Sequence, residues 1–234
     1  MTVEEPAIVC SELAKAFNGV RVLESVTLEI QAGEIIGIIG ANGAGKTVLL
    51  DIVSGFLRPD RGEVRIRGKR VTNLPPESIA DLSVGRLFQN LRIFEAMTVG
   101  ENLLVGTCRL RCGWGSVARS FLGIAIPSGA CAQSTELARA IRLFDRFDDA
   151  GRHFSVGQRR LLAIARMLAR RPEILLLDEP LAGLDEQWAC WVVQNLRSVV
   201  EAGGSAIFID HDIDAVKAYC TRIYRLDEGR LESC

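Results

Sequence analysis

Residues 35–47 read IIGIIGANGAGKT, and this stretch decides the fold. Its first five residues are apolar apart from one glycine, which is typical of a strand that is buried on both faces of a parallel sheet. The glycine-rich octet from Gly40 to Thr47 matches the P-loop pattern, and a helical stretch continues from Lys46 to about Ser54. The order of strand, glycine-rich loop and helix predicts an α/β fold with an anion site where the helix begins.

The P-loop pattern carries its own chemistry. Its glycines allow successive backbone N–H groups to turn inward around phosphate oxygens, and the helix N-terminus adds partial positive charge. Lys46 can reach the β- and γ-phosphates of a nucleotide, and Thr47 can ligate Mg²⁺. A plain glycine-rich turn is the alternative, but such a turn needs neither the strand nor the helix. The predicted nucleotide-binding residues of this segment are Asn42, Gly43, Ala44, Gly45, Lys46, Thr47 and Val48.

Two adjacent carboxylates follow a second apolar strand. Residues 174–180 read ILLLDEP, so Asp178 and Glu179 lie at the carboxyl end of this strand, where open α/β sheets bind ligands. We expect Asp178 to hold the Mg²⁺ shell and Glu179 to polarise the water that attacks the γ-phosphate. Acidic residues at such a position often only begin a turn, and this alternative stays open for the pair taken alone.

A third motif, SVGQ at residues 155–158, opens a helix that continues to Leu168. Ser155 followed by Gln158 is the pattern of a capping box. A helix N-terminus with a Ser hydroxyl and the N–H of Gly157 is also a site for a phosphate brought by another molecule, and the two interpretations are compatible. Gln89 and His211 carry no assignment from their own surroundings.

The remaining pattern indicates a P-loop NTPase core with a mostly parallel sheet. An N-terminal antiparallel β subdomain is expected at about residues 1–33 and 62–72, and an inserted helical subdomain at about 91–168. Short apolar strands at 174–177 and 206–209 are separated by a helix, and this alternation predicts parallel strands with right-handed crossovers. The whole chain, residues 1–234, is therefore expected to form one nucleotide-binding domain.

Composition excludes several classes of protein. The 28 Lys and Arg residues are balanced by 29 Asp and Glu residues, which argues against a chain that coats nucleic acid with a basic face. No window of about 20 consecutive apolar residues occurs, so the sequence predicts no membrane span. Seven cysteines without a CxxC pair or a signal peptide indicate reduced cytosolic thiols. Cys108 and Cys112 would share a helix face, but a metal site there is disfavoured.

Taken together and in this order, the motifs resemble the nucleotide-binding subunit of ABC transporters over nearly the whole chain. The resemblance implies ATP and Mg²⁺ as ligands, Phe17 as the aromatic ring that stacks on adenine, and Gln89 as the loop glutamine that senses Mg²⁺ and water. It also implies that Ser155, Gly157 and Gln158 belong to the signature that contacts the partner subunit's nucleotide. Asp185 then lies in the loop that crosses the dimer, and His211 is the switch histidine at the γ-phosphate.

Within that family, residues 85–103 resemble the ATP-binding proteins of branched-chain amino acid importers and their urea or amide relatives, and lipopolysaccharide-export ATPases share part of the pattern. The resemblance implies membrane permease subunits, a second ATPase subunit that is either a homologue or a copy, a solute-binding protein, and a place on the cytoplasmic face of the membrane. Val156, Val48 and a short segment at about 104–150 depart from the pattern. A soluble ABC ATPase without a transporter, and an idle binding module, are the alternatives.

Overall fold

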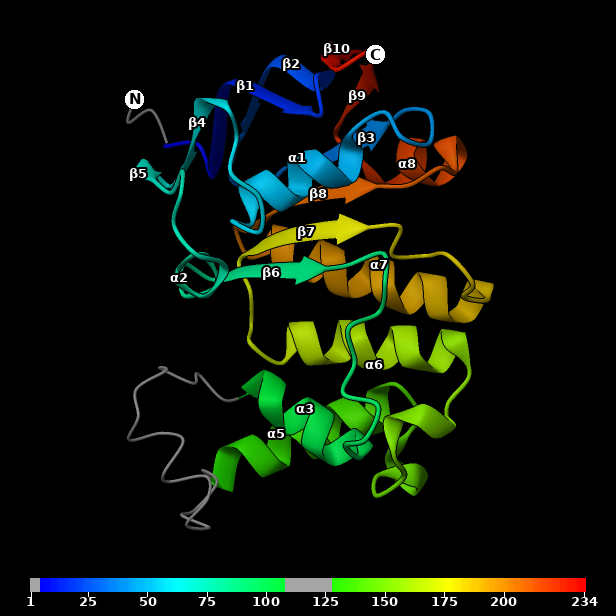
Figure 1. Ribbon diagram of the computed structural model, residues 1–234. Helices are drawn as coiled ribbons and strands as arrows, with labels where there is room; N and C mark the ends of the chain where they lie inside the picture. Colours follow the sequence, from blue (N-terminus) through cyan, green and yellow to red (C-terminus); the bar gives the residue numbers. More distant parts are fainter. Residues whose placement is uncertain (1–4, 108–127) are drawn as a thin grey trace. The chain divides into compact units, whose positions relative to one another are not determined.

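The computed structural model describes residues 5–107 and 128–234, and the predicted helix face with Cys108 and Cys112 lies outside these residues. The chain forms two compact units, one made of residues 1–89 and 172–234 and the other of residues 90–171. Figure 1 traces the order of the elements along the chain. Each unit is described by itself.

A six-stranded sheet forms the centre of the first unit, with the order β10-β9-β3-β8-β7-β6. The inner pairs are parallel, and only β10 runs antiparallel to its neighbour β9. Every residue of β3, β7 and β8 is buried, as expected for apolar strands that are covered on both faces. The strands are β3 (Ile35–Ile39), β6 (Val84–Leu87), β7 (Ile174–Asp178), β8 (Ser205–Ile209), β9 (Arg222–Asp227) and β10 (Arg230–Ser233).

A second, antiparallel sheet in the same unit has the order β2-β1-β4-β5. Phe17 pairs with Val20 across a two-residue turn in which Asn18 and Gly19 both have positive φ, a geometry that suits the twist of a hairpin. The strands are β1 (Ile8–Phe17), β2 (Val20–Ile30), β4 (Arg61–Ile66) and β5 (Lys69–Arg70). The two sheets confirm the predicted combination of an antiparallel N-terminal sheet with a mostly parallel one.

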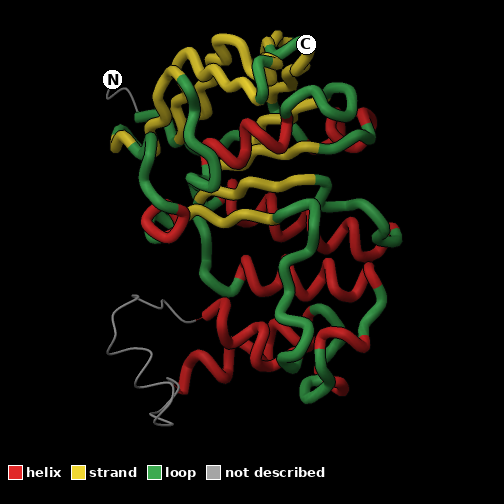
Figure 2. Tube along the Cα trace, viewed as in Figure 1, coloured by secondary structure: helices red, strands yellow, loops and turns green. Residues whose placement is uncertain are grey.

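Helices pack on the parallel sheet. Figure 2 shows these helices in red beside the strands of the sheet in yellow. Helix α1 packs on β7, α7 on β8, and α8 on β3, where Gly37 leaves no space for a side chain beneath Val216. The helices of this unit are α1 (Lys46–Val53), α2 (Pro76–Ala80), α7 (Glu186–Glu201) and α8 (Ile213–Tyr219). None of the helices in the described parts of the chain is long and apolar enough to cross a bilayer.

The second unit is helical. Helix α3 packs on α5 and α6, and a Cβ at Gly106 of α3 would lie 2.3 Å from the backbone oxygen of Arg166, so a glycine is needed where the helices meet. The side-chain nitrogen of the buried Asn102 donates to backbone oxygens of the loop before α3, including that of Phe94, and so holds this loop. The helices are α3 (Val99–Thr107), α5 (Ser128–Ala140), α6 (Val156–Leu168) and the short 3-10 turns Phe144–Arg146 and Gly151–His153.

Candidate functional site

The P-loop connects β3 to α1 and is held tightly at both ends. A Cβ at Gly40 would lie 2.3 Å from the backbone oxygen of Leu226 in β9, so no side chain fits there. Gly45 precedes α1 with φ 101°, in the left-handed region, and a Cβ there would lie 2.9 Å from the backbone oxygen of Val22. Gly40 and Gly45 are therefore required by the neighbouring strands as well as by any phosphate.

The amino group of Lys46 folds back over the loop. It donates to the backbone oxygens of Gly40 and Ala41 at 2.7 and 2.9 Å, and the side chain is buried. Helix α1 has no side-chain cap at its N-terminus, whereas Ser155, Asp185 and Asp212 cap α6, α7 and α8. A buried ammonium beside uncapped helix N–H groups is an arrangement that accepts a phosphate.

Asp178 ends β7 and Glu179 follows it, so the two carboxylates lie at the same edge of the parallel sheet as the P-loop. β7 is parallel to β8, which is parallel to β3, so Asp178 emerges at the edge where the P-loop begins. Asp178 is buried, and its Oδ2 lies 3.4 Å from Nη2 of Arg86. Glu179 has φ 49°, and its backbone N–H donates to the oxygen of Ile209 at 2.8 Å. A non-glycine residue held in the left-handed region is strained, and such strain is common where a side chain must be aimed at a ligand.

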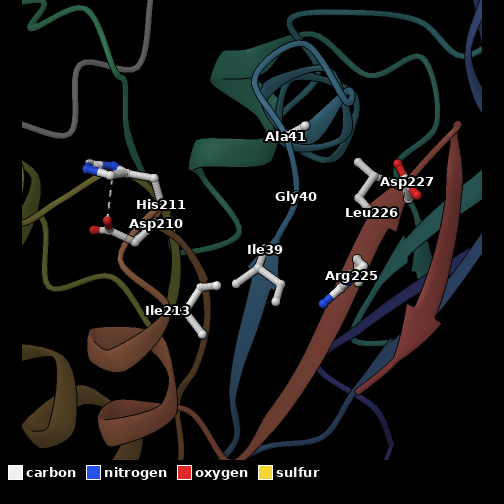
Figure 3. Close-up of a pocket in the computed structure, with 9 residues that line it drawn as sticks. All are labelled: Ile39, Gly40, Ala41, Asp210, His211, Ile213, Arg225, Leu226 and Asp227. Carbon is white, nitrogen blue, oxygen red and sulfur yellow. Dashed lines mark ion pairs between the residues drawn. The ribbon is translucent and has the colours of Figure 1, made fainter.

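A cavity of about 310 Å³ opens beside the P-loop, at the ends of β3, β8 and β9 (Figure 3). His211 lies at its rim with an exposed side chain, and its Nδ1 is 3.4 Å from Oδ1 of Asp210. Asp210 is buried, and its Oδ1 also accepts the backbone N–H of Asp212 at 3.1 Å. The predicted switch histidine is thus next to the loop that would hold phosphate, two residues after β8, the strand that lies between β3 and β7.

Gln89 and Phe17 lie at the margin of this region of the first unit. Gln89 is exposed two residues after β6, which neighbours β7 in the sheet. Phe17 is 42% exposed at the tip of the β1–β2 hairpin, and Nζ of Lys15 lies 5.5 Å from its ring centroid. The close approach of Val22 to Gly45 brings this hairpin against the P-loop, so an exposed aromatic ring is available on the adjoining surface.

The remaining predicted residues are at helix starts. The capping box is confirmed in α6, where Ser155 Oγ accepts the N–H of Gln158 at 3.3 Å and the side chain of Gln158 accepts the N–H of Ser155 at 3.1 Å. Val156 is 67% exposed, so its side chain takes no part in packing the helix. Asp185 caps α7 in the first unit by accepting the N–H of Trp188 at 3.0 Å.

Comparison with known proteins decides the family. A model of the family described as ABC transporter matches residues 23–182. The chain belongs to the ABC transporter family. It is the ATP-binding and ATP-hydrolysing subunit of an ABC transporter, with the ATPase fold predicted from its motifs.

Individual relatives of this ABC subunit cover nearly its whole length. It is 34% identical to the high-affinity branched-chain amino acid transport ATP-binding protein LivG of Salmonella typhimurium, over 96% of the chain and 89% of that protein. It is 31% identical to the lipopolysaccharide export system ATP-binding protein LptB of Escherichia coli, over 96% of the chain and 88% of that protein. A solved dimeric ATP-binding cassette in a post-hydrolysis state, bound to ADP and Pi, superposes with a TM-score of 0.82 at 25% identity, covering 96% of each chain.

Two functional candidates in this ABC subunit escaped the sequence analysis. Arg86 lies within residues 85–103, which carry only a family resemblance, yet its guanidinium lies between Asp51 and Asp178. Asp210 follows an apolar strand in the same way as Asp178 does, and this parallel is the signal that could have identified it as a buried carboxylate. For Arg86 no such local signal exists, because its two partners are 35 and 92 residues away.

Proposed function

We propose that this chain energises the import of branched-chain amino acids or related amide or urea solutes through a separate membrane permease. The observation that carries the proposal is the likeness to LivG over nearly the entire chain, together with the phosphate-accepting loop and the two carboxylates at one edge of the sheet. The likeness to LptB makes export of a lipopolysaccharide the second candidate. The two candidates share the same ATP chemistry and differ in the permease.

In this proposal the P-loop holds the phosphates of ATP. Lys46 exchanges its bonds to the loop oxygens for bonds to the β- and γ-phosphates, and the backbone N–H groups of the loop complete the cradle. Phe17 stacks on the adenine ring, because its aromatic side chain is exposed at the tip of the β1–β2 hairpin. The loop residues that contact phosphate are Asn42, Gly43, Ala44, Gly45, Thr47 and Val48.

The oxygen donors of the site fit Mg²⁺. The Thr47 hydroxyl at the start of α1, the Asp178 carboxylate and the Gln89 amide are the hard ligands that this ion prefers, and Asp178 is a buried carboxylate beside a single guanidinium. Bound there, the ion would neutralise negative charge on the phosphates. Glu179 orients the attacking water and accepts its proton, and His211 donates to the γ-phosphate.

The signature residues act on a nucleotide held by a second subunit. Ser155, Gly157 and Gln158 lie at the N-terminus of α6, where the hydroxyl and the N–H groups can turn from capping to phosphate binding. Asp185 at the start of α7 lies in the loop that meets the same partner. ATP then joins two subunits, either a copy of this chain or a homologue, and hydrolysis separates them.

The permease converts this cycle into transport. A permease that binds the ATP-bound dimer more tightly than the hydrolysed state is driven into another conformation by the difference in binding free energy. We therefore place the chain at the cytoplasmic face of the membrane, held by permease subunits, with a solute-binding protein on the other side.

Purification of the tagged chain from its native membranes, followed by mass spectrometry and solute uptake, tests this proposal. Co-purified permease subunits, and loss of radiolabelled leucine uptake when the chain carries Lys46→Ala, are expected. Unchanged leucine uptake in that variant with loss of lipopolysaccharide export would favour the second candidate. Recovery without any membrane protein would contradict both.

A further inference from the structure

A buried arginine connects the two elements that carry the predicted Mg²⁺ ligands. Arg86 is in β6, its side chain is 6% exposed, and its Nη2 lies 3.2 Å from Oδ1 of Asp51 and 3.4 Å from Oδ2 of Asp178. Asp51 is in α1, four residues after Thr47 and therefore on the same face of the helix. One guanidinium thus bridges the helix of the P-loop and the strand of Asp178.

Packing alone does not account for this arrangement. Within the described part of the chain, Nε and Nη1 of Arg86 are buried without a hydrogen-bond partner. The ring of Phe88 lies 5.2 Å from the guanidinium carbon. Buried ion pairs of this kind are generally no more stabilising than apolar side chains of the same size, so the bridge calls for another role.

We propose that Arg86 is a positioning residue that holds the Asp178 carboxylate in one orientation relative to α1 before Mg²⁺ and nucleotide arrive. This inference rests on the role proposed above for Asp178. Because β6 and β7 are parallel, with Arg86 opposite Leu176, the guanidinium lies on the side of the sheet to which Asp178 also points. Asp51, in the second turn of α1, anchors the other end of the bridge, so the Asp178 carboxylate and α1 are held together.

Charge and orientation predict opposite effects of losing Arg86. If Arg86 acted only as a nearby positive charge, its removal would strengthen the attraction between Asp178 and Mg²⁺. If Arg86 positions the carboxylate, its removal raises the Mg²⁺ concentration needed for half-saturation, as the loss of a group that orients a metal ligand commonly does, by roughly 10- to 100-fold.

The test measures binding of trinitrophenyl-ATP to the full chain by fluorescence, first in EDTA and then along a Mg²⁺ titration, for Arg86→Met and Arg86→Lys. We expect the EDTA affinity of Arg86→Met to equal that of the unsubstituted chain, the half-saturating Mg²⁺ concentration to rise about 10- to 100-fold, and kcat to fall with little change in KM. Arg86→Lys should give an intermediate shift, because an ammonium retains the charge but lacks the guanidinium fork.

Arg222→Met is the control for loss of an arginine bridge elsewhere in the same sheet, since Arg222 in β9 pairs with Glu34. It should leave the Mg²⁺ titration unchanged. An unchanged or lower Mg²⁺ requirement in Arg86→Met overturns the inference, and if that variant does not fold, an unchanged requirement in both Arg86→Lys and Asp51→Asn does so. Asp178→Asn tests the role proposed for Asp178 separately from that of Arg86. If Asp178→Asn leaves the Mg²⁺ dependence intact, the role proposed for Asp178 is wrong as well.

Discussion

At the scale of single residues, Lys46 has the most direct consequence. Its ammonium is buried and bonded only to P-loop oxygens among the contacts described, so it is ready to transfer to phosphate. Lys46→Ala should weaken ATP binding by roughly 10- to 100-fold, because a charge-assisted hydrogen bond contributes about 1.5–3 kcal/mol. Isothermal titration calorimetry measures this change, with Lys217→Ala, an exposed lysine of α8, as the control. Equal dissociation constants for the two variants would exclude the assigned role of Lys46.

The difference in burial between the cysteines predicts a difference in their rates of alkylation. Desolvation raises the pKa of Cys10 and of Cys220 to about 12, and this lowers the fraction of reactive thiolate at any pH below that value. Cys190 and Cys234 are exposed free thiols. Iodoacetamide at about pH 8, near the ordinary thiol pKa, should therefore alkylate Cys190 and Cys234 before Cys10 and Cys220. Peptide mass spectrometry measures the order, and rapid labelling of Cys10 in the folded chain would contradict the packing of β1.

Local motifs predicted the candidate site residues, but not the contacts between them. Lys46 and Asp178 could be identified because a strand, a loop and a helix follow one another along the chain. The bridge from Arg86 to Asp51 and Asp178 could not, because it depends on the register between β6 and β7 and on the packing of α1 against the sheet. Only the folded chain brings these three side chains together.

At the scale of elements, the proposed function gives the cap of α6 two purposes, to stabilise the helix and to bind the partner's phosphate. Ser155→Ala removes the hydroxyl that caps the helix, and it should reduce the free energy of unfolding by about 1 kcal/mol. Ser155→Asn should keep most of this stability, because asparagine is an equally good cap, but lose the contact proposed for the partner's phosphate. Urea unfolding and ATP-dependent dimerisation measure the two properties. If Ser155→Asn dimerises as well as the unsubstituted chain, Ser155 is only a cap.

The elements that the sequence predicted well are those with a strong local pattern. β3, β7 and α1 begin and end within a residue of expectation, because their apolar runs are bounded by glycine, by carboxylates or by the P-loop. β6 and β9 were not anticipated. Gly85 and Arg86 interrupt the apolar sequence of β6, and β9 is only partly buried. Neither strand therefore shows a clear apolar run. Their strand structure comes from pairing with β7 and β3.

At the scale of the whole molecule, the predicted ATP-binding residues and the signature belong to different units. The P-loop, Asp178 and His211 are in the unit built on the parallel sheet, and Ser155 is in the helical unit. The family is established, whereas the ATP sandwich of two subunits remains the proposal that gives both units a part in one catalytic cycle. In the proposed function the permease recognises the transported solute, so the residues of this chain bear on the solute only through family likeness.

The most direct test of the sandwich is size-exclusion chromatography of Glu179→Gln with ATP and Mg²⁺. The substitution keeps the size of the side chain and removes the carboxylate that accepts a proton, so hydrolysis should slow by roughly 10²- to 10⁴-fold while ATP still binds. We predict that the variant elutes as a dimer with ATP and as a monomer with ADP, and that adding Lys46→Ala abolishes the dimer. Normal turnover by Glu179→Gln, with a monomer in both nucleotides, would contradict the account.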